Sequence, residues 1–399
     1  MSLLTLLKNL KILDFSTLLP GPYASLILAD LGADVLRIEA PNRPDMARMV
    51  PPLDGDTSVL HQYVNRSKRS LALDLKKPEA VQIVKRLIQQ YDIVLEQFRP
   101  GVMDRLGLGY EELKKVNPQI IYCSLTGYGQ TGPYRDRAGH DINYLSIAGA
   151  ANYTGPKEVG PKSPGLQVAD LAGGSLYSVI GILAAVLHRN ELGEGQAIDI
   201  SMSDSTFALN AANGAGFLAG GVEPERESLL LNGGTFYNYY ETKDGRFFSV
   251  GSIEPKFKKQ LCEGIGRPEL FSIGMSEDPE DVFTFKEAVR EAFLSKTFDE
   301  WLSIFSDLDA CVEPVLKFSE ACMHPHIQER ELIVEVPKPD GTSQKQLANP
   351  LKFTSFQPEY KYIGRELGAD TTQVLKELGM SDKEIEQLQE IGIFGTPMS

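Results

Sequence analysis

The sequence has few of the residues from which disulfide frameworks and metal centres are built. Its 399 residues include only five histidines and four cysteines, and no two cysteines form a CxxC pair. This composition argues against a disulfide framework and fits reduced thiols in the cytoplasm. The chain also lacks an excess of positive charge. Its net charge of −14 argues against a general affinity for nucleic acid or acidic membranes.

Targeting signals and long apolar runs are lacking as well. The N-terminal stretch MSLLTLLKNLKILDFS is apolar but has no basic start and no small-residue cleavage site, so no signal peptide is predicted. The longest nearly apolar run, Leu176 to Leu187, is shorter than the roughly 20 residues that a membrane-spanning helix needs. With 42% hydrophobic and 24% charged residues, the chain has the composition of a globular protein. We therefore expect a cytoplasmic protein with no membrane partner.

Strand and helix patterns alternate along the first third of the chain. Buried strands are predicted over residues 10–16, 34–41, 69–75, 92–98 and 119–126, and helices over residues 21–33, 78–91 and 104–116. Strands separated by helices of this length form parallel βαβ units, so the expected fold is α/β with a Rossmann-like parallel sheet. Such sheets bind ligands at the carboxyl ends of their strands.

A chain of this length is expected to form two domains. We assign residues 1–200 to a large Rossmann-like domain, which the C-terminal segment 330–399 completes by packing back on it. Residues 201–229 are predicted to be a linker because they are rich in glycine and charge. Residues 230–329 are predicted to form a smaller α+β domain.

The stretch GYGQTG at residues 127–132 matches the GxGxxG dinucleotide fingerprint. That fingerprint requires a helix directly after its last glycine, and here Pro133 and a polar loop follow. No acidic residue ends a second strand about 20 residues further on, as ribose binding requires. The stretch therefore predicts a turn whose glycines let the backbone approach a ligand.

Two acidic residues and a histidine that follow this turn are candidate functional residues. His140 and Asp141 are adjacent in AGHDINY, and Asp170 opens a segment that is apolar almost all round, which is typical of a helix buried on most faces. At a helix start Asp170 can be a cap. Gly173 and Gly174 lower the helix propensity of the same turn and indicate the close approach of another backbone or a ligand. Both interpretations of Asp170 stay open.

Several segments together resemble the family III CoA-transferases and α-methylacyl-CoA racemases. The resemblance runs in one order from about Leu10 to near Gly392. It implies a Rossmann-like large domain built from both chain ends, a small domain between them, an interlocked homodimer, and CoA-thioester substrates. The segments that carry it are LADLGADVLRIEAP, RSLALDL, FRPGVMDRLGLGYEEL, GYGQTGP, GHDINY and VADLAGGSLYSVIGILAAVLHR.

The resemblance implies catalytic roles for His140, Asp170 and Glu254. In the transferases the residue that matches Asp170 is a nucleophile that forms a mixed anhydride, and in the racemases it is an acid/base opposite a histidine. Transferases commonly lack the histidine of GHD and carry a longer glycine-rich loop in the small domain. This chain has His140, and its corresponding loop, LNGGTFY, contains only two glycines, Gly233 and Gly234. Glu254 matches the carboxylate that pairs with the racemase histidine. A solvated strand end is the alternative for Glu254.

Racemisation needs proton removal on one face of the α-carbon and proton return on the other. His140 and Asp170 would supply two groups with different proton affinities, and Glu254 would orient the imidazole. A backbone N–H at the start of the Asp170 helix would stabilise the enolate oxygen. A helix N-terminus favours the charged form of Asp170, whereas an apolar pocket favours the neutral form. Asp141 and Tyr144 match family positions that line the pocket.

CoA binding is expected on the large domain. Arg37, Arg99 and Arg105 would pair with phosphates in a fork geometry, although a helix-surface charge is an equal alternative for Arg105. Leu71 and Phe98 would bracket the adenine.

The leading hypothesis is an isomerase that epimerises 2-methylacyl-CoA thioesters without a metal or redox cofactor. No carboxylate or cysteine pair completes a ligand set for the nearby His324 and His326, so no metal site is predicted there. The alternative activity is CoA transfer between carboxylic acids with Asp170 as nucleophile. A CoA-thioester-binding protein without catalysis is a third hypothesis, which the intact set of His140, Asp170 and Glu254 disfavours.

Overall fold

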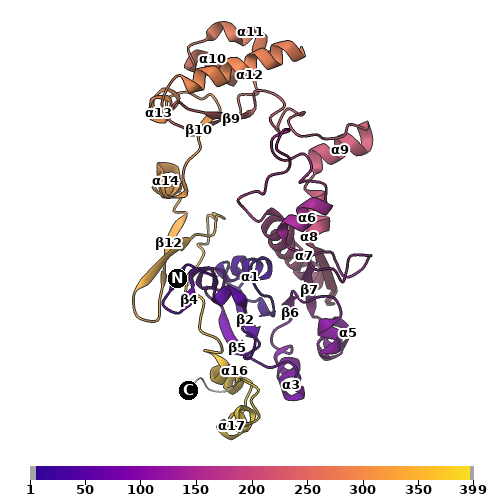
Figure 1. The fold of residues 1–399 in the computed structure, drawn as a ribbon. Helices are drawn as coiled ribbons and strands as arrows, with labels where there is room; N and C mark the ends of the chain where they lie inside the picture. Colours follow the sequence, from indigo (N-terminus) through magenta and orange to yellow (C-terminus); the bar gives the residue numbers. More distant parts are fainter. Residues whose placement is uncertain (1–5, 396–399) are drawn as a thin grey trace. The chain divides into compact units, whose positions relative to one another are not determined.

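The computed structural model describes residues 6–395, which form two compact units (Figure 1). Unit 1 contains the chain up to Ala148, the segment Pro164–Leu209 and the chain from Gln328 onward. Unit 2 contains Gly149–Ser163 and Asn210–Ile327. Unit 1 is thus built from both ends of the chain. It differs from the predicted large domain because the loop after Ala148 belongs to unit 2.

The elements of unit 1 alternate between strands and helices over its first half. Its strands are β1 Lys11–Asp14, β2 Asp34–Glu39, β3 Leu53–Asp54, β4 Thr57–Ser58, β5 Arg69–Ala72, β6 Ile93–Glu96, β7 Ile121–Thr126, β8 Ala197–Ser201, β12 Ile333–Pro337 and β13 Ser343–Leu347. Its helical elements are α1 Pro20–Asp30, the 3-10 turn η1 Met46–Arg48, α2 Val59–Val64, α3 Pro78–Leu87, α4 Val102–Arg105, α5 Tyr110–Val116, α6 Asp141–Ile147, the π-helical turn η2 Ala169–Leu176, α7 Tyr177–Leu192, α8 Met202–Ala208, α16 Thr371–Glu377 and α17 Asp382–Glu390.

Six strands of unit 1 form one parallel sheet in the order β5-β2-β1-β6-β7-β8. The strands are short and contain buried apolar residues, and β6 and β7 are buried along their whole length. The predicted α/β fold with a parallel sheet is confirmed. The strand order reverses between β1 and β6, and ligands of such sheets bind outside the carboxyl ends of the strands at this switch point.

Helices cover both faces of the sheet. On one face α3, α5 and α16 pack on a core that includes Leu13, Leu36 and Tyr122. On the other face α1 contacts β1 and β2, and α7 contacts β7 and β8. Side chains alternate along a strand, so Leu125 of β7 points away from Tyr122 and lies against Gly174 of η2. Burial of both faces excludes water from the sheet and stabilises it.

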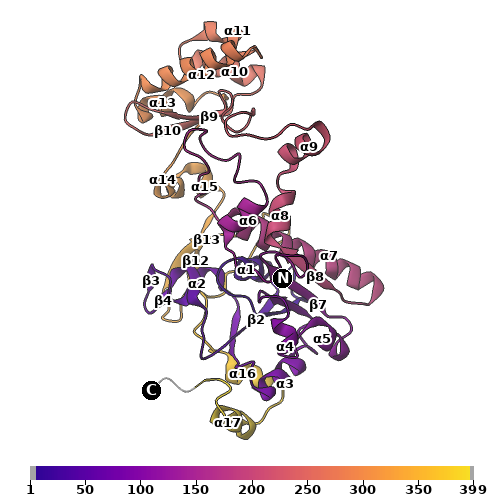
Figure 2. The same ribbon diagram turned by 45° about the vertical axis from the view of Figure 1, so that its right-hand side comes forward.

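The C-terminal segment packs back on the start of the chain, as predicted. Figure 1 and Figure 2 both show α16 beside α3, with the yellow C-terminal helices next to violet N-terminal elements. The Asp370 and Ser70 backbones are joined by an N–H···O bond of 2.9 Å, and the Ser70 N–H donates to the Asp370 carboxylate at 2.8 Å. Ser381 caps α17 by accepting a bond from the Glu384 N–H. In the described chain this segment adds helices and the β12–β13 hairpin, while all six strands of the main sheet precede Met202.

Unit 2 is a small α+β unit with an aromatic core. Its three-stranded antiparallel sheet has the order β11-β10-β9, and Phe248, Phe293 and Trp301 lie at the centre of the core. The elements are α9 Ala211–Gly220, β9 Asn238–Glu241, β10 Phe247–Val250, α10 Pro255–Gly264, η3 Pro268–Leu270, α11 Phe271–Gly274, α12 Pro279–Leu294, α13 Phe298–Phe305, β11 Val312–Pro314, α14 Phe318–Met323 and α15 Pro325–Glu329, whose last two residues belong to unit 1.

The segment 201–229, which the sequence suggests is a linker, contains two helices. α8 begins where the Ser201 hydroxyl accepts a bond from the Asp204 N–H, which satisfies an otherwise unpaired donor of the first turn. α9 forms despite its glycines because alanines and Leu218 favour helix, and it ends at Gly221 in the left-handed conformation.

The helical run Ala169–Leu192 is longer than the apolar run noted in the sequence. It is 24 residues long and, by length and composition, could cross a membrane; within residues 6–395 no other helix meets this criterion. One such helix is weak support for a membrane location, because a core helix has the same composition. Here 44% of its most apolar stretch is buried inside the protein, where it covers β7 and β8.

Candidate active site

His140 and Asp141 lie at the start of α6, in the connection that follows the carboxyl end of β7. His140 is the residue before the helix, its side chain is exposed, and its backbone N–H donates to Asn143 Oδ1 at 3.0 Å. This bond satisfies the backbone at the helix start and fixes the position from which the imidazole projects.

Tyr144 explains the glycines of the GYGQTG and GHD motifs. Its ring fits between Gly127 and Gly139, where an added Cβ would lie 2.5 Å and 2.7 Å from the ring carbon Cε1. The Tyr144 hydroxyl donates to the Gly139 carbonyl at 2.6 Å. The glycines thus admit an aromatic ring of α6, and no helix follows Gly132 to bind a pyrophosphate.

Asp170 is the second residue of the π-helical turn η2, so the cap interpretation is wrong. The residue at the cap position is Val168, and no side-chain capping bond is present there. Single π-helical turns inside α-helices occur frequently at functional sites. Gly173 permits the close approach of another backbone, as predicted: an added Cβ would lie 3.1 Å from the carbonyl oxygen of Met202 in α8.

A hydrogen bond connects the first residue of α6 to the helical turn η2 that carries Asp170. The Asp170 N–H donates to Asp141 Oδ1 at 3.0 Å. The N–H of Asp170 is therefore occupied, and it does not serve as the free enolate donor expected at this helix start. The N–H of Leu171 is also engaged, with the Gln167 carbonyl at 2.9 Å.

The carboxyl group of Asp170 has an unusual proton affinity. Burial, helped by the negative charge of Asp141, raises its pKa to about 6, while the nearby His140 acts in the opposite direction. Burial likewise raises the pKa of the Tyr144 hydroxyl. Burial, one of the two opposing influences predicted for Asp170, therefore favours the neutral form. The result is a carboxyl group that can gain or lose a proton near neutral pH.

Glu254 lies in unit 2, whereas His140 and Asp170 lie in unit 1. It follows β10 and occupies the position before α10, with an exposed side chain. Its predicted pairing with the imidazole of His140 stays a prediction.

Two of the five predicted CoA-binding residues are buried. Leu71 of β5 has no exposed surface and belongs to the core of unit 1, so its side chain does not offer a face on which adenine could stack. Arg37 of β2 is 2% exposed and forms ion pairs with Glu39 at 3.4 Å and Asp45 at 2.5 Å. These carboxylates already balance its charge, although Arg37 Nη1 is buried without a hydrogen-bond partner. Both side chains are buried because β2 and β5 pair in the interior of unit 1, and this pairing could not be predicted from the sequence.

Of the other three, Phe98 and Arg99 lie on the turn after β6, and Arg105 is the last residue of the following helix α4. Phe98 is half-buried, and Arg99 and Arg105 are exposed. Glu96, which was not among the predicted site residues, holds this turn because its Oε2 accepts the Phe98 N–H at 2.8 Å. Burial raises the pKa of Glu96 to about 7. The sequence contained a signal for Glu96, because a charged residue at the end of an apolar strand is costly to bury unless it has a partner or a function.

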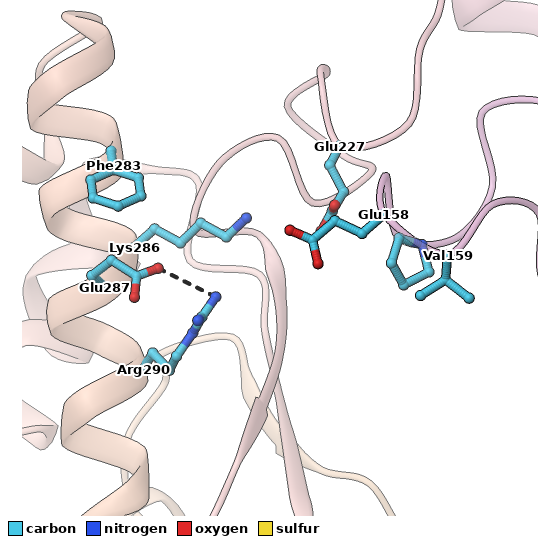
Figure 3. Close-up of a pocket in the computed structure, with 8 residues that line it drawn as sticks. Glu158, Val159, Glu227, Phe283, Lys286, Glu287 and Arg290 are labelled. Atoms are coloured by element: carbon cyan, nitrogen blue, oxygen red, sulfur yellow. Dashed lines mark ion pairs between the residues drawn. The ribbon is translucent and has the colours of Figure 1, made fainter.

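A separate cavity of about 460 Å³ lies in unit 2 (Figure 3). Its charged lining residues carry both signs: Lys286 extends from α12 toward the loops that carry Glu158 and Glu227, and Arg290 pairs with Glu287 at 3.3 Å. None of the predicted site residues lines it. The described residues contain no group of three or more metal-ligating side chains, and the backbone N–H of His326 donates to His324 Nδ1 at 3.2 Å.

Comparison with known proteins identifies relatives that match almost the whole chain. The family described as CoA-transferase family III matches residues 7–371. The chain is 37% identical over 392 residues to the alpha-methylacyl-CoA racemase of Homo sapiens, with 96% of each chain covered. It is 32% identical over 395 residues to succinyl-CoA:glutarate CoA-transferase of Homo sapiens, with 97% of this chain and 89% of that protein covered.

A solved structure agrees with these relatives. A CAIB/BAIF family protein from Brucella suis has a TM-score of 0.80 and 28% sequence identity, over 92% of this chain and 98% of its own. Racemases and transferases both occur among the relatives, and both act on acyl-CoA thioesters by name. The chain therefore belongs to CoA-transferase family III, a family of enzymes of acyl-CoA chemistry.

Proposed function

We propose that this protein epimerises 2-methylacyl-CoA thioesters at the α-carbon by two-base proton transfer. The observation that carries the proposal is the carboxyl group of Asp170, whose pKa is raised to about 6 and whose backbone N–H is bonded to Asp141, the residue next to His140. Imidazole is the commonest general acid–base group in enzymes, and a carboxyl group with a raised pKa can serve as the second group. The racemase relative at 37% identity supports the same reaction.

The proton balance of the reaction is simple. Neutral His140 removes the α-hydrogen of one enantiomer as a proton, and the thioester carbonyl delocalises the electron pair as an enolate. Protonated Asp170 then returns a proton to the opposite face of the same carbon. The enzyme is left as imidazolium and carboxylate, the state that accepts the other enantiomer or resets by exchange with water. Glu254 would stabilise the imidazolium.

The proposal includes the setting of the enzyme. CoA is carried on the substrate, so no separate cofactor is required by this reaction. We expect an interlocked homodimer in the cytoplasm, with no nucleic acid or membrane partner. The turn after β6 with Phe98 and Arg99, together with Arg105 of α4, would receive the nucleotide end of CoA.

Deuterium exchange tests the proposed reaction. One enantiomer of a 2-methylacyl-CoA is incubated with the enzyme in deuterated water, with and without an acceptor carboxylic acid. We expect deuterium at the α-carbon and loss of optical purity without the acceptor. No deuterium incorporation, together with CoA transfer to the acceptor, would show the transferase reaction instead, with Asp170 as nucleophile. The transferase relative at 32% identity makes this the second candidate.

His140→Ala separates the two reactions at one residue. General acid–base groups contribute ~10²–10⁴-fold, so racemisation should decrease by about that factor in both directions, since both directions pass through the same transition states. Exchange can survive for one enantiomer because Asp170 still serves its own face. A transferase should keep most of its activity in this variant. Asp170→Ala serves as the control that should abolish either reaction, and a folded His140→Ala enzyme with an unchanged racemisation rate would contradict the proposal.

A further inference from the structure

We infer that Arg135 binds a phosphate group of CoA together with Arg105. This inference rests on the proposed function and assigns part of its substrate binding to a residue that the sequence analysis passed over. It gives a physical reason for a preference for thioesters of CoA over thioesters of pantetheine, which has no phosphate.

The two arginines come from different turns and meet at Gly101. Arg105 is the last residue of α4, after β6, and Arg135 lies in the loop after β7. A Cβ placed on Gly101 would lie 3.4 Å from Arg105 Nη1 and 4.0 Å from Arg135 Nη2. Because Gly101 has no side chain, the space next to it is empty, and both guanidinium groups lie at the edge of this space. β6 and β7 are neighbours in the parallel sheet, so both turns follow carboxyl ends, the edge at which such sheets bind ligands.

The charges at this point are not balanced by the protein. Arg105 forms no ion pair among residues 6–395, and Arg135 has only a contact of 3.6 Å with the neighbouring Asp136, whose side chain is 79% exposed. Exposed pairs of this kind contribute little. Two like charges that border one point gain nothing from each other, whereas a phosphate placed between them would pair with both guanidinium forks.

The loop that carries Arg135 is held by aromatic rings. Tyr128 lies against Tyr134 with ring centroids 5.3 Å apart and against Tyr144 at 5.2 Å, both edge to face. The guanidinium of Arg137 lies 4.0 Å from the centroid of the Tyr134 ring. The loop is therefore fixed to Tyr144, which is in the same helix start as His140, and Arg135 is presented from a positioned loop.

The test compares two substrates and two ligands. Arg135→Ala is assayed with a 2-methylacyl-CoA and with the corresponding 2-methylacyl-pantetheine, which has no phosphate. We expect the KM for the CoA thioester to rise about tenfold, since a charge-assisted hydrogen bond is worth roughly that factor or more, with kcat and the KM for the pantetheine thioester unchanged. Arg135→Lys should recover part of the loss because it keeps the charge without the fork. Arg330→Ala, at an exposed arginine of unit 1 without a described ion pair, is the charge-matched control and should behave as wild type.

Calorimetric titration with free CoA separates this inference from the proposed reaction. A wild-type protein that binds CoA but does not exchange the α-hydrogen would refute the racemase proposal and leave the role of Arg135 to be decided by the same titration of the variant. Weaker CoA binding in Arg135→Ala, with a smaller dependence on salt, supports the inference. An unchanged CoA affinity, or equal losses for the CoA and pantetheine thioesters, overturns it.

Discussion

Asp141 is the residue that most directly adjusts the chemistry of Asp170. It accepts the Asp170 N–H at 3.0 Å, and its negative charge adds to the effect of burial on the neighbouring carboxyl group. A single side chain thus fixes the start of the catalytic helix and helps to raise the pKa of Asp170 toward neutral pH.

Asp141→Asn should lower the pKa of Asp170. The amide oxygen can still accept the Asp170 N–H, but the repulsive charge is gone, so the carboxylate form becomes easier to reach. The acid limb of kcat/KM is the same in both reaction directions, because the equilibrium constant does not depend on pH. It should lie near pH 6 in the wild type and at lower pH in the variant. The measurement is the pH profile of racemisation in each direction.

The matched control for this substitution is Asp136→Asn, which removes the same charge from an exposed position in the preceding loop. Its acid limb should coincide with that of the wild type. An acid limb of Asp141→Asn that stays in place, or moves to higher pH, would contradict the role assigned to Asp141.

At the scale of elements, α6 is fitted to the loops around it through Tyr144. Gly127 follows β7 and Gly139 precedes α6. Because neither glycine has a side chain, the Tyr144 ring fits against both. The ring fixes the helix that begins next to His140. Packing of this kind is sensitive to one added methyl group, because protein interiors have few voids.

Gly139→Ala should therefore weaken both stability and activity. Its Cβ would lie 2.7 Å from Tyr144 Cε1 and 2.9 Å from the Tyr128 hydroxyl, so the rings must move. Overpacking typically costs about 1–3 kcal/mol of the free energy of unfolding, and racemisation should fall because His140 is the next residue. Scanning calorimetry and the racemisation assay measure the two effects.

Gly165→Ala is the control in the same unit, because no atom lies within 4 Å of an added Cβ there. It should change the free energy of unfolding by no more than ~0.5 kcal/mol. If Gly139→Ala unfolds and racemises as the control does, the steric explanation of the GHD glycine is wrong.

At the scale of the whole molecule, the helical run Ala169–Leu192 has an exposed apolar side. Leu176, Ile180 and Leu187 follow helical spacing and are 46%, 60% and 68% exposed, while the opposite side of the helix covers β7 and β8. An exposed apolar stripe of this kind marks an interaction surface.

We predict that this stripe is covered in a homodimer. Light scattering should give twice the chain mass of 44.0 kDa, and the value should stay constant on dilution if the subunits are interlocked. The measurement is made over a wide range of protein concentration. A folded, monodisperse species with the mass of one chain would refute the dimer.

Much of the fold and part of the site could be predicted from the sequence. The strands β1, β2, β5, β6 and β7 fall inside the predicted segments, because short apolar runs between helical patterns are a local signal. The capping box of Ser381 and Glu384 at the start of α17 is a local pattern of the same kind. The two helices within 201–229 were not predicted, because glycine content there indicated a loop and the capping by Ser201 was overlooked.

The sequence by itself determined the order of the elements and the presence of His140, Asp170 and Glu254, because these depend on local patterns and residue identity. Only the tertiary structure decided which groups are buried and which meet. It buried Leu71 and Arg37, joined Asp141 to Asp170 and brought Arg105 and Arg135 to Gly101. Burial and contact depend on segments distant in the chain, and the pKa of Asp170 follows from desolvation and neighbouring charge, which no local pattern contains.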